Sequence, residues 1–273
     1  MAVSAIAARA TAQFASGVDL VEVYATVVDA QGRSVDGLAR DEFIVEEDGR
    51  PQDVQVFTAG RFPLSLAVAV DRSFSVPQVR LTQVVYAVQG LLGQLRPDDR
   101  AIVLAIGSTV DPLTPLSTDH RAAYDALRGL EPWGTTPLFD AVRQSITAIQ
   151  GAAGRRALIL VTDGDDRYSE ATRADLLAFA RRNDVLVYPV LLTKAVPPVF
   201  TELAALTGGR ATAEPRLDRL PAALASVAAE LRQQYLLGYA PGRAGERNEW
   251  RSIRVRVTRP GLRVRARDGY FAR

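Results

Sequence analysis

Residues 64–75 read Leu64-Ser65-Leu66-Ala67-Val68-Ala69-Val70-Asp71-Arg72-Ser73-Phe74-Ser75 and change character half-way along. The first part is almost entirely apolar, which is typical of a parallel strand covered on both faces. From Asp71 onward an oxygen-bearing side chain occupies every second position, at Asp71, Ser73 and Ser75. Open α/β sheets bind ligands at the carboxyl ends of their strands, and such oxygens suit Mg²⁺ or Ca²⁺. A serine-rich turn that caps a helix explains this segment, taken alone, equally well.

Two later segments favour the cation site. The first is the loop Trp133-Gly134-Thr135-Thr136, which leads into a predicted helix with Pro137 at a position suited to the first helical residue. The second is Ala157-Leu158-Ile159-Leu160-Val161-Thr162-Asp163-Gly164, another apolar strand that ends in an acid and a glycine. We therefore expect Asp71, Thr136 and Asp163 to converge at one edge of a sheet.

Together, D-x-S-x-S at residues 71–75, G-x-T-x-L at 134–138 and T-D-G at 162–164 resemble the metal-ion-dependent adhesion site (MIDAS) of von Willebrand factor type A domains. The resemblance implies a bound Mg²⁺, or Ca²⁺ or Mn²⁺ in its place. By this resemblance Ser73, Ser75 and Thr136 bind the cation directly, and Asp71 and Asp163 hold it largely through water.

The resemblance also implies metal-dependent protein binding, as in adhesion or scaffolding, rather than catalysis. Neutral hydroxyl ligands leave the charge of a divalent ion poorly compensated, so we expect an Asp or Glu side chain of a protein partner to complete the coordination. The residues beside the site that we expect to contact this partner are Arg72, Phe74, Trp133 and Thr135.

Two of these residues depart from the family pattern. Phe74 stands where a small residue is usual, and two interpretations stay open: an exposed apolar anchor for the partner, or a side chain that packs on the sheet edge. Arg72 places a cation beside a cation site. It either pairs with an acid such as Asp165 or Asp166, or weakens ion binding.

The composition excludes several classes of site. The chain has 273 residues, is 48% hydrophobic and 23% charged, and carries a formal net charge of only +2, so no overall field recruits nucleic acid. Without cysteine there is no disulfide or thiolate metal site, and the single histidine, His120, excludes a histidine cluster. No apolar run reaches the length of a membrane span. Residues 1–17 resemble a leader remnant, so we expect them to be disordered and the protein to be periplasmic or secreted.

The chain divides into a central domain and two flanks. Residues 61–233 alternate strands and helices, the pattern of a doubly wound α/β domain. Residues 18–60 and 234–273 read as strands of one shared β domain. Residues 18–58 hold ten acids and three arginines, whereas residues 234–273 hold ten arginines and three acids. This opposition favours pairing between the flanks over nucleic-acid binding by the arginine faces. Strands at 43–47 and 53–58 are predicted to form a hairpin around Asp48-Gly49.

The flanks extend the resemblance. Residues 32–43, 47–52, 234–239 and 259–271 are similar to segments of bacterial proteins related to von Willebrand factor A domains. The expected fold is therefore a Rossmann-like, mostly parallel doubly wound sheet, with a flanking β-sheet or sandwich domain built from both the N- and C-terminal segments.

Two other functional classes compete with protein binding. One is a Mg²⁺-dependent, phosphatase-like hydrolase with Asp71 as nucleophile, since haloacid dehalogenase-type hydrolases also place an aspartate at the end of a strand. Such enzymes need a second acid where this chain has Ser73, and Lys194, the only lysine, lies in an unconvincing context. A glycine-rich phosphate loop is also missing from the sequence. The other class is a structural envelope protein whose cation site is vestigial.

Overall fold

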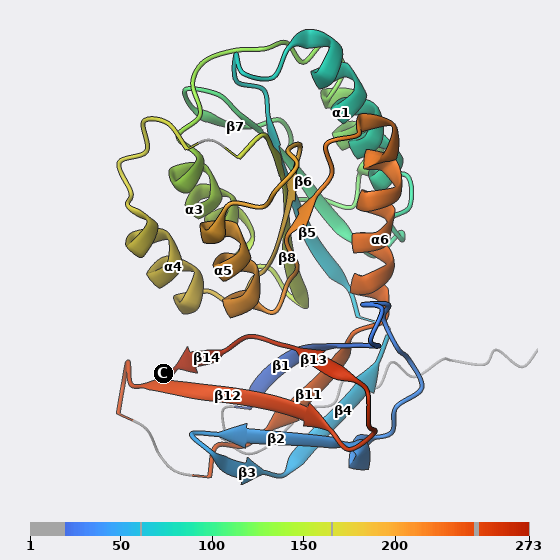
Figure 1. Ribbon diagram of the computed structural model, residues 1–273, viewed down its shortest axis with the longest axis vertical. Coiled ribbons are helices and arrows are strands. Elements are labelled where there is room, and N and C mark those ends of the chain that lie inside the picture. Colours follow the sequence, from blue (N-terminus) through green and yellow to red (C-terminus); the bar gives the residue numbers. More distant parts are fainter. Residues whose placement is uncertain (1–19, 61, 165, 243–245, 273) are drawn as a thin grey trace, which may run out of the picture.

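The computed structural model describes residues 20–60, 62–164, 166–242 and 246–272. They form an α/β unit stacked on a β unit, and the first and last described strands both belong to the β unit (Figure 1). The expected leader, residues 1–17, lies outside the described residues. Among the helices within those ranges, none combines the length and the hydropathy needed to cross a membrane.

A six-stranded sheet forms the middle of the α/β unit, in the order β10-β9-β8-β5-β6-β7. Neighbouring strands are parallel from β10 to β6, and the edge strand β7 runs antiparallel to β6. Every residue of the central strand β5 is buried, as its apolar sequence predicts. The strands are β5 (Leu64–Asp71), β6 (Arg100–Ile106), β7 (Val110–Pro112), β8 (Arg155–Thr162), β9 (Leu186–Leu191) and β10 (Thr212–Ala213).

Helices cover both faces of this sheet (Figure 1). On one face, Leu66, Val68 and Val70 of β5 share a core with α1 (Gln78–Leu92), α2 (His120–Ala126) and α6 (Leu220–Arg232), the last preceded by the short turn η2 (Leu217–Arg219). On the other face, Ala67 and Ala69 share a core with α3 (Leu138–Ile149), α4 (Arg173–Arg182) and α5 (Pro198–Thr207). Alternate residues of one strand thus serve opposite layers, and the doubly wound architecture predicted from the sequence is confirmed.

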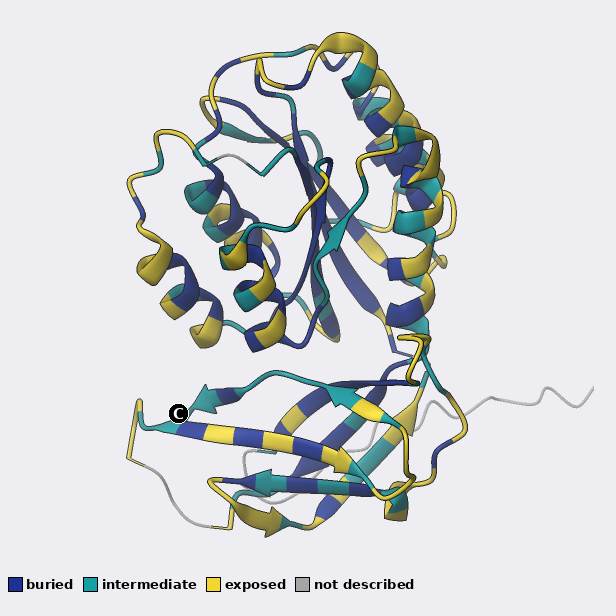
Figure 2. Cartoon of the chain, in the orientation of Figure 1, coloured by how far each residue is buried: buried dark blue, intermediate teal, exposed yellow. Residues whose placement is uncertain are grey.

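The β unit is a sandwich of two four-stranded sheets, ordered β13-β1-β11-β4 and β14-β12-β2-β3. Their facing apolar side chains form a third core, with Val23, Val45, Tyr235 and Val255 among its members. Figure 2 shows β12 alternating between buried and exposed residues, as expected for a strand with one face on a core. The strands are β1 (Val21–Val28), β2 (Phe43–Glu47), β3 (Arg50–Gln52), β4 (Val54–Ala59), β11 (Tyr235–Tyr239), β12 (Trp250–Val257), β13 (Arg263–Arg265) and β14 (Gly269–Phe271), with the short turn η1 (Arg40–Glu42) before β2.

The two ends of the chain build this sandwich together, as predicted. β1 and β4 pair with β11, and β2 pairs antiparallel with β12, which joins the acidic flank to the arginine-rich one. An ion pair joins Arg256 of β12 to Glu46 of β2, and Arg259 pairs with Glu42 just beyond the ends of these strands. The predicted hairpin partner was wrong: β2 turns at Asp48-Gly49 into the short strand β3, and β4 lies in the other sheet.

Candidate functional site

Asp71 ends the central strand at the carboxyl edge of the parallel sheet, and its side chain is fully buried. Both carboxylate oxygens accept hydrogen bonds: Oδ1 from the Ser73 amide (2.9 Å) and Oδ2 from the Thr162 hydroxyl (2.7 Å). The Thr162 hydroxyl in turn accepts a bond from the Gly164 amide (3.0 Å). The ends of β5 and β8 are thereby fixed against each other.

A second carboxylate lies near Asp71. Burial raises the pKa of Asp71; the bonds from Ser73 and Thr162 oppose this shift, and the negative charge of Asp163 adds to it. The Oδ1 atom of Asp163 is itself buried and has no hydrogen-bond partner within the described residues. This edge of the sheet therefore concentrates negative charge that the protein's own donors compensate only in part.

The two serines predicted as ligands lie next to Asp71 in the turn that precedes α1. Their hydroxyl oxygens are 2.9 Å apart. Ser73 is buried, whereas Ser75 is exposed. The backbone that carries them is held by a bond from the Val76 amide to the Ser73 carbonyl (2.9 Å).

The loop that carries Thr136 is joined to both other segments through backbone bonds. The Trp133 amide donates to the Arg72 carbonyl (2.6 Å), and the Phe74 amide donates to the Gly134 carbonyl (3.1 Å). The Thr136 carbonyl accepts from the Arg167 amide (2.7 Å) in the loop after β8. Thr136 is buried two residues before α3, and Thr135 beside it is exposed. Hydrogen bonds thus join three segments that lie more than ninety residues apart at their extremes.

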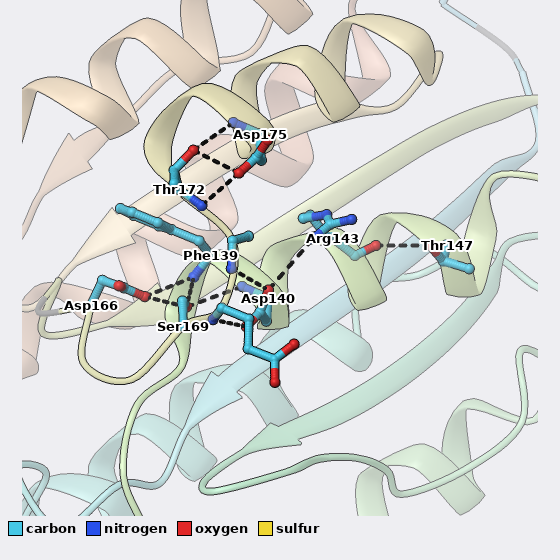
Figure 3. Close-up of polar contacts among 10 residues, drawn as sticks. Phe139, Asp140, Arg143, Thr147, Asp166, Ser169, Thr172 and Asp175 are labelled. Atoms are coloured by element: carbon cyan, nitrogen blue, oxygen red, sulfur yellow. Dashed lines mark hydrogen bonds and ion pairs between the residues drawn. The ribbon is translucent and has the colours of Figure 1, made fainter.

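Residues to which the sequence analysis did not assign this role hold the loop after β8 onto the start of α3, and Figure 3 shows their bonds. Asp166 Oδ1 accepts from the Phe139 amide (3.0 Å) and from the Ser169 hydroxyl (2.6 Å). Asp140, in the first turn of α3, accepts from the amides of Glu170 (2.7 Å) and Ala171 (3.2 Å). The first turn of a helix has unpaired amides and favours acids, which is the only sequence signal that could have pointed to these anchors.

Arg72 contacts side chains other than the predicted cation ligands. Its guanidinium pairs with Asp111 of β7 (2.9 Å) and lies over the Trp133 ring, with Cζ 5.0 Å from the ring centroid. The expected pairing with Asp166 was wrong, because that carboxylate accepts from the start of α3; Asp165 lies outside the described residues. Phe74 is 71% exposed, which favours the first of its two interpretations.

Residues 66–165 match the family model described as von Willebrand factor type A domain. The matched residues, from β5 to just past β8, are therefore similar to von Willebrand factor type A domains. This matches the resemblance of the three motifs and the doubly wound sheet that carries them. A comparison with curated protein sequences gives no match.

Several solved structures share this fold at low sequence identity. A von Willebrand factor type A protein from Catenulispora acidiphila superposes with a TM-score of 0.58 and 13% identity, covering 94% of this chain and 76% of that one. An aerotolerance-related membrane protein from Bacteroides fragilis gives 0.51 and 17%, covering 62% and 98%. Proximal thread matrix protein 1 of the mussel byssus, with a zinc-occupied MIDAS motif, gives 0.53 and 13%, covering 68% and 49%.

The donor set at this edge of the sheet fits a hard divalent cation. Within the described residues, no three His, Cys, Asp or Glu side chains cluster as a metal site, so a cation here would depend on hydroxyl oxygens together with Asp71 and Asp163. Oxygen ligands of this kind are those that Mg²⁺ and Ca²⁺ prefer. Two observations favour such an ion: the buried Asp163 Oδ1 has no hydrogen-bond partner among the described residues, and the charge of Asp163 raises the pKa of Asp71 beyond the effect of burial.

Proposed function

We propose that the protein is a metal-ion-dependent protein-binding module. Ser73, Ser75 and Thr136 would hold Mg²⁺, or Ca²⁺ or Mn²⁺, and Asp71 and Asp163 would act mainly through bound water. When bound, the ion supplies a positive centre to which an Asp or Glu of a protein partner can coordinate. The chain's own residues orient the ligands and keep the two aspartates close together.

One observation carries this proposal: the charge of Asp163 acts on the buried Asp71, and among the described residues no ion pair joins a basic side chain to either carboxylate. Arg72, the nearest cation in the sequence, is bonded to Asp111 instead. Two neighbouring carboxylates in a buried setting destabilise each other unless a proton or a cation relieves them. The zinc-occupied MIDAS motif of the mussel protein, a similar fold, supports the same use of this edge.

The position of Asp71 supports binding over hydrolysis. A nucleophilic carboxylate needs an oxygen that can reach the substrate. Both oxygens of Asp71 are engaged by Ser73 and Thr162, and the side chain is fully buried. Mg²⁺-dependent hydrolysis of a generic phosphate ester that disappears in Asp71→Asn would overturn this conclusion.

Titration calorimetry with MgCl₂ and MnCl₂ tests the ion site. We expect saturable heat for the natural protein and a loss of at least about tenfold in affinity for Asp71→Asn and Thr136→Ala. Thr135→Ala is the matched control, because Thr135 is the exposed neighbour of Thr136 and is not a predicted ligand; its affinity should not change. Thermal melting of each variant checks that it is folded. An absence of heat with the natural protein would instead favour a structural protein with a vestigial site.

A further inference from the structure

Each of the three joined loops that carry the predicted cation ligands also carries an exposed aromatic side chain. Five large hydrophobic side chains are exposed among the described residues. Three of them lie on the three hydrogen-bonded segments at the sheet edge: Phe74 (71% exposed), Trp133 (41%) and Tyr168 (78%). We call these three the apolar rim. The other two are Val79 and Tyr86, both on α1.

Packing contacts hold the Trp133 side chain in place. Its ring packs against Gly107, just after β6, where an added β-carbon would lie 2.5 Å from Trp133 Cε3. The ring also lies against the Arg72 guanidinium, which Asp111 holds in place. A large aromatic side chain held by two such contacts yet 41% exposed loses little conformational freedom when it binds a partner.

Tyr168 and Phe74 are also held at the backbone. The bond between Ser169 Oγ and Asp166 Oδ1 brackets the turn that carries Tyr168, whose φ of 73° lies in the left-handed region that a tyrosine rarely adopts. Such a conformation costs free energy, so its retention at an exposed aromatic points to a binding role. Phe74 is fixed by the bond of its amide to the Gly134 carbonyl.

We propose that the apolar rim selects partners in which the metal-binding Asp or Glu lies among apolar residues. This inference rests on the proposed function of the cation site. An acid that reaches an ion beside Ser73 brings its neighbours over the rim, because residues two positions apart in an extended chain are about 7 Å apart on the same side. Apolar side chains there remove rim surface from water, whereas polar ones would lose hydration without a partner.

Three blocked peptides test the proposal: one aspartate with two leucines on each side, the same aspartate with two serines on each side, and an asparagine between the leucines. The chain has two tryptophans, so the indole N–H signal of Trp133 reports binding and that of Trp250, in the β unit, is an internal reference. In Mg²⁺ we expect the leucine-flanked aspartate peptide to bind about tenfold more tightly than the serine-flanked one. EDTA should abolish both.

Variants separate the rim from the ion. Tyr168→Ser and Phe74→Ser should each reduce the preference for the leucine-flanked over the serine-flanked aspartate peptide, measured at the Trp133 signal. The affinity of each variant for Mg²⁺, measured by calorimetry, should stay unchanged. Tyr86→Ser is the matched control, since Tyr86 is equally exposed (72%) but lies on α1, about 12 Å along the helix axis from its start. Its peptide preference should equal that of the natural protein.

The outcomes are distinguishable. Equal binding of the leucine- and serine-flanked aspartate peptides overturns the rim proposal and leaves the proposed function standing. Equal binding of the aspartate and asparagine peptides overturns the acid contact and hence the proposed function. Mg²⁺-dependent self-association that Trp133→Ala abolishes would assign the rim to a second copy of this chain, which also overturns the proposal.

Discussion

Thr162 controls the setting of Asp71 although it is not itself a predicted ligand. Its hydroxyl donates to Asp71 Oδ2 and accepts from the Gly164 amide, so it links the central carboxylate to the turn that carries Asp163. Groups that orient metal-binding carboxylates influence affinity nearly as strongly as the ligands do. The T-D-G motif contained this residue, but its spacing alone could not show that the hydroxyl points across to the neighbouring strand.

Replacing Thr162 with valine should therefore weaken the proposed ion site. Thr162→Val keeps the side-chain shape but leaves Asp71 Oδ2 without its donor, and we expect Mg²⁺ affinity to fall about tenfold in titration calorimetry. Thr147→Val is the matched control, because the Thr147 hydroxyl bonds only to the carbonyl of Arg143 on the surface of α3 (Figure 3). Unchanged affinity in Thr162→Val would show that the bond does not orient Asp71.

Other contacts of the site depend on pairings that a single sequence does not reveal. Arg72 finds Asp111 only because β7 turns back antiparallel beside β6, which brings a residue thirty-nine positions away next to the end of β5. The anchors of the loop after β8 on α3 likewise join residues about thirty positions apart. Spacing within a motif predicted the candidate ligands, whereas the support around them needed the fold.

Between strands, charge pattern and sheet geometry act together in the β unit. Glu46 and Glu47 are neighbours on β2 that face opposite sides. Glu46 pairs with Arg256 at the surface, whereas Glu47 is buried, pairs with Arg251 (3.0 Å) and accepts from the hydroxyls of Tyr239 (2.9 Å) and Tyr270 (2.8 Å). Burial and, after it, the bond to Glu47 raise the pKa of Tyr270 to about 12, so this hydroxyl remains a donor at neutral pH.

This difference predicts unequal effects of two matched substitutions. Glu47→Gln leaves the buried charge of Arg251 without its closest counter-charge and should lower the free energy of unfolding by about 3 kcal/mol. Glu46→Gln removes a partly exposed pair and should cost less than about 1 kcal/mol. Urea unfolding followed by circular dichroism measures both. Similar small losses in the two variants would mean that the buried network contributes little to stability.

Most helices and strands could be predicted because their apolar periodicity is strong, as in the fully buried β5. The hairpin after β2 was assigned to the wrong partner for a physical reason. Alternation shows that residues 54–59 form a strand, but not to which sheet they belong. Three residues of β3 complete the hairpin, and after Asp53 the chain crosses to the opposite sheet, where β4 pairs with β11.

The two units of the molecule are joined by polar groups where the chain passes between them. Gln234, fully buried between α6 and β11, donates to Thr26 of the β unit (2.9 Å) and to Tyr188 of the α/β unit (3.3 Å). Arg265 of β13 pairs with the buried Glu230 of α6 (2.7 Å). The similarity to the Catenulispora structure covers 94% of this chain and therefore includes residues of both units, so the combination of the two is not confined to this protein.

Asp99 connects three parts of the α/β unit beside this crossing. Its carboxylate accepts from the amides of Leu64 (3.2 Å) and Arg96 (2.7 Å) and pairs with Arg232 at the end of α6. Burial alone would raise the pKa of Asp99, but the hydrogen bonds from Arg232, Arg96 and Leu64 outweigh it and hold the pKa below its usual value. A carboxyl with a lowered folded-state pKa stabilises the native state above its unfolded pKa, near 4, and loses this contribution as the pH falls through its folded value.

Asp99→Asn should therefore lower the free energy of unfolding at pH 7 by about 3 kcal/mol, because Arg232 loses its counter-charge. The difference in free energy of unfolding between this variant and the natural protein should become smaller below about pH 4, because Asp99 of the natural protein becomes protonated there and loses its charge. Asp98→Asn, at the exposed neighbour, is the matched control and should show little difference at either pH. Urea unfolding at a series of pH values measures all three proteins. A gap between Asp99→Asn and the natural protein that stays constant from pH 7 to pH 3 would mean that the charge of Asp99 does not hold α6 in place, and that only its shape matters at this crossing.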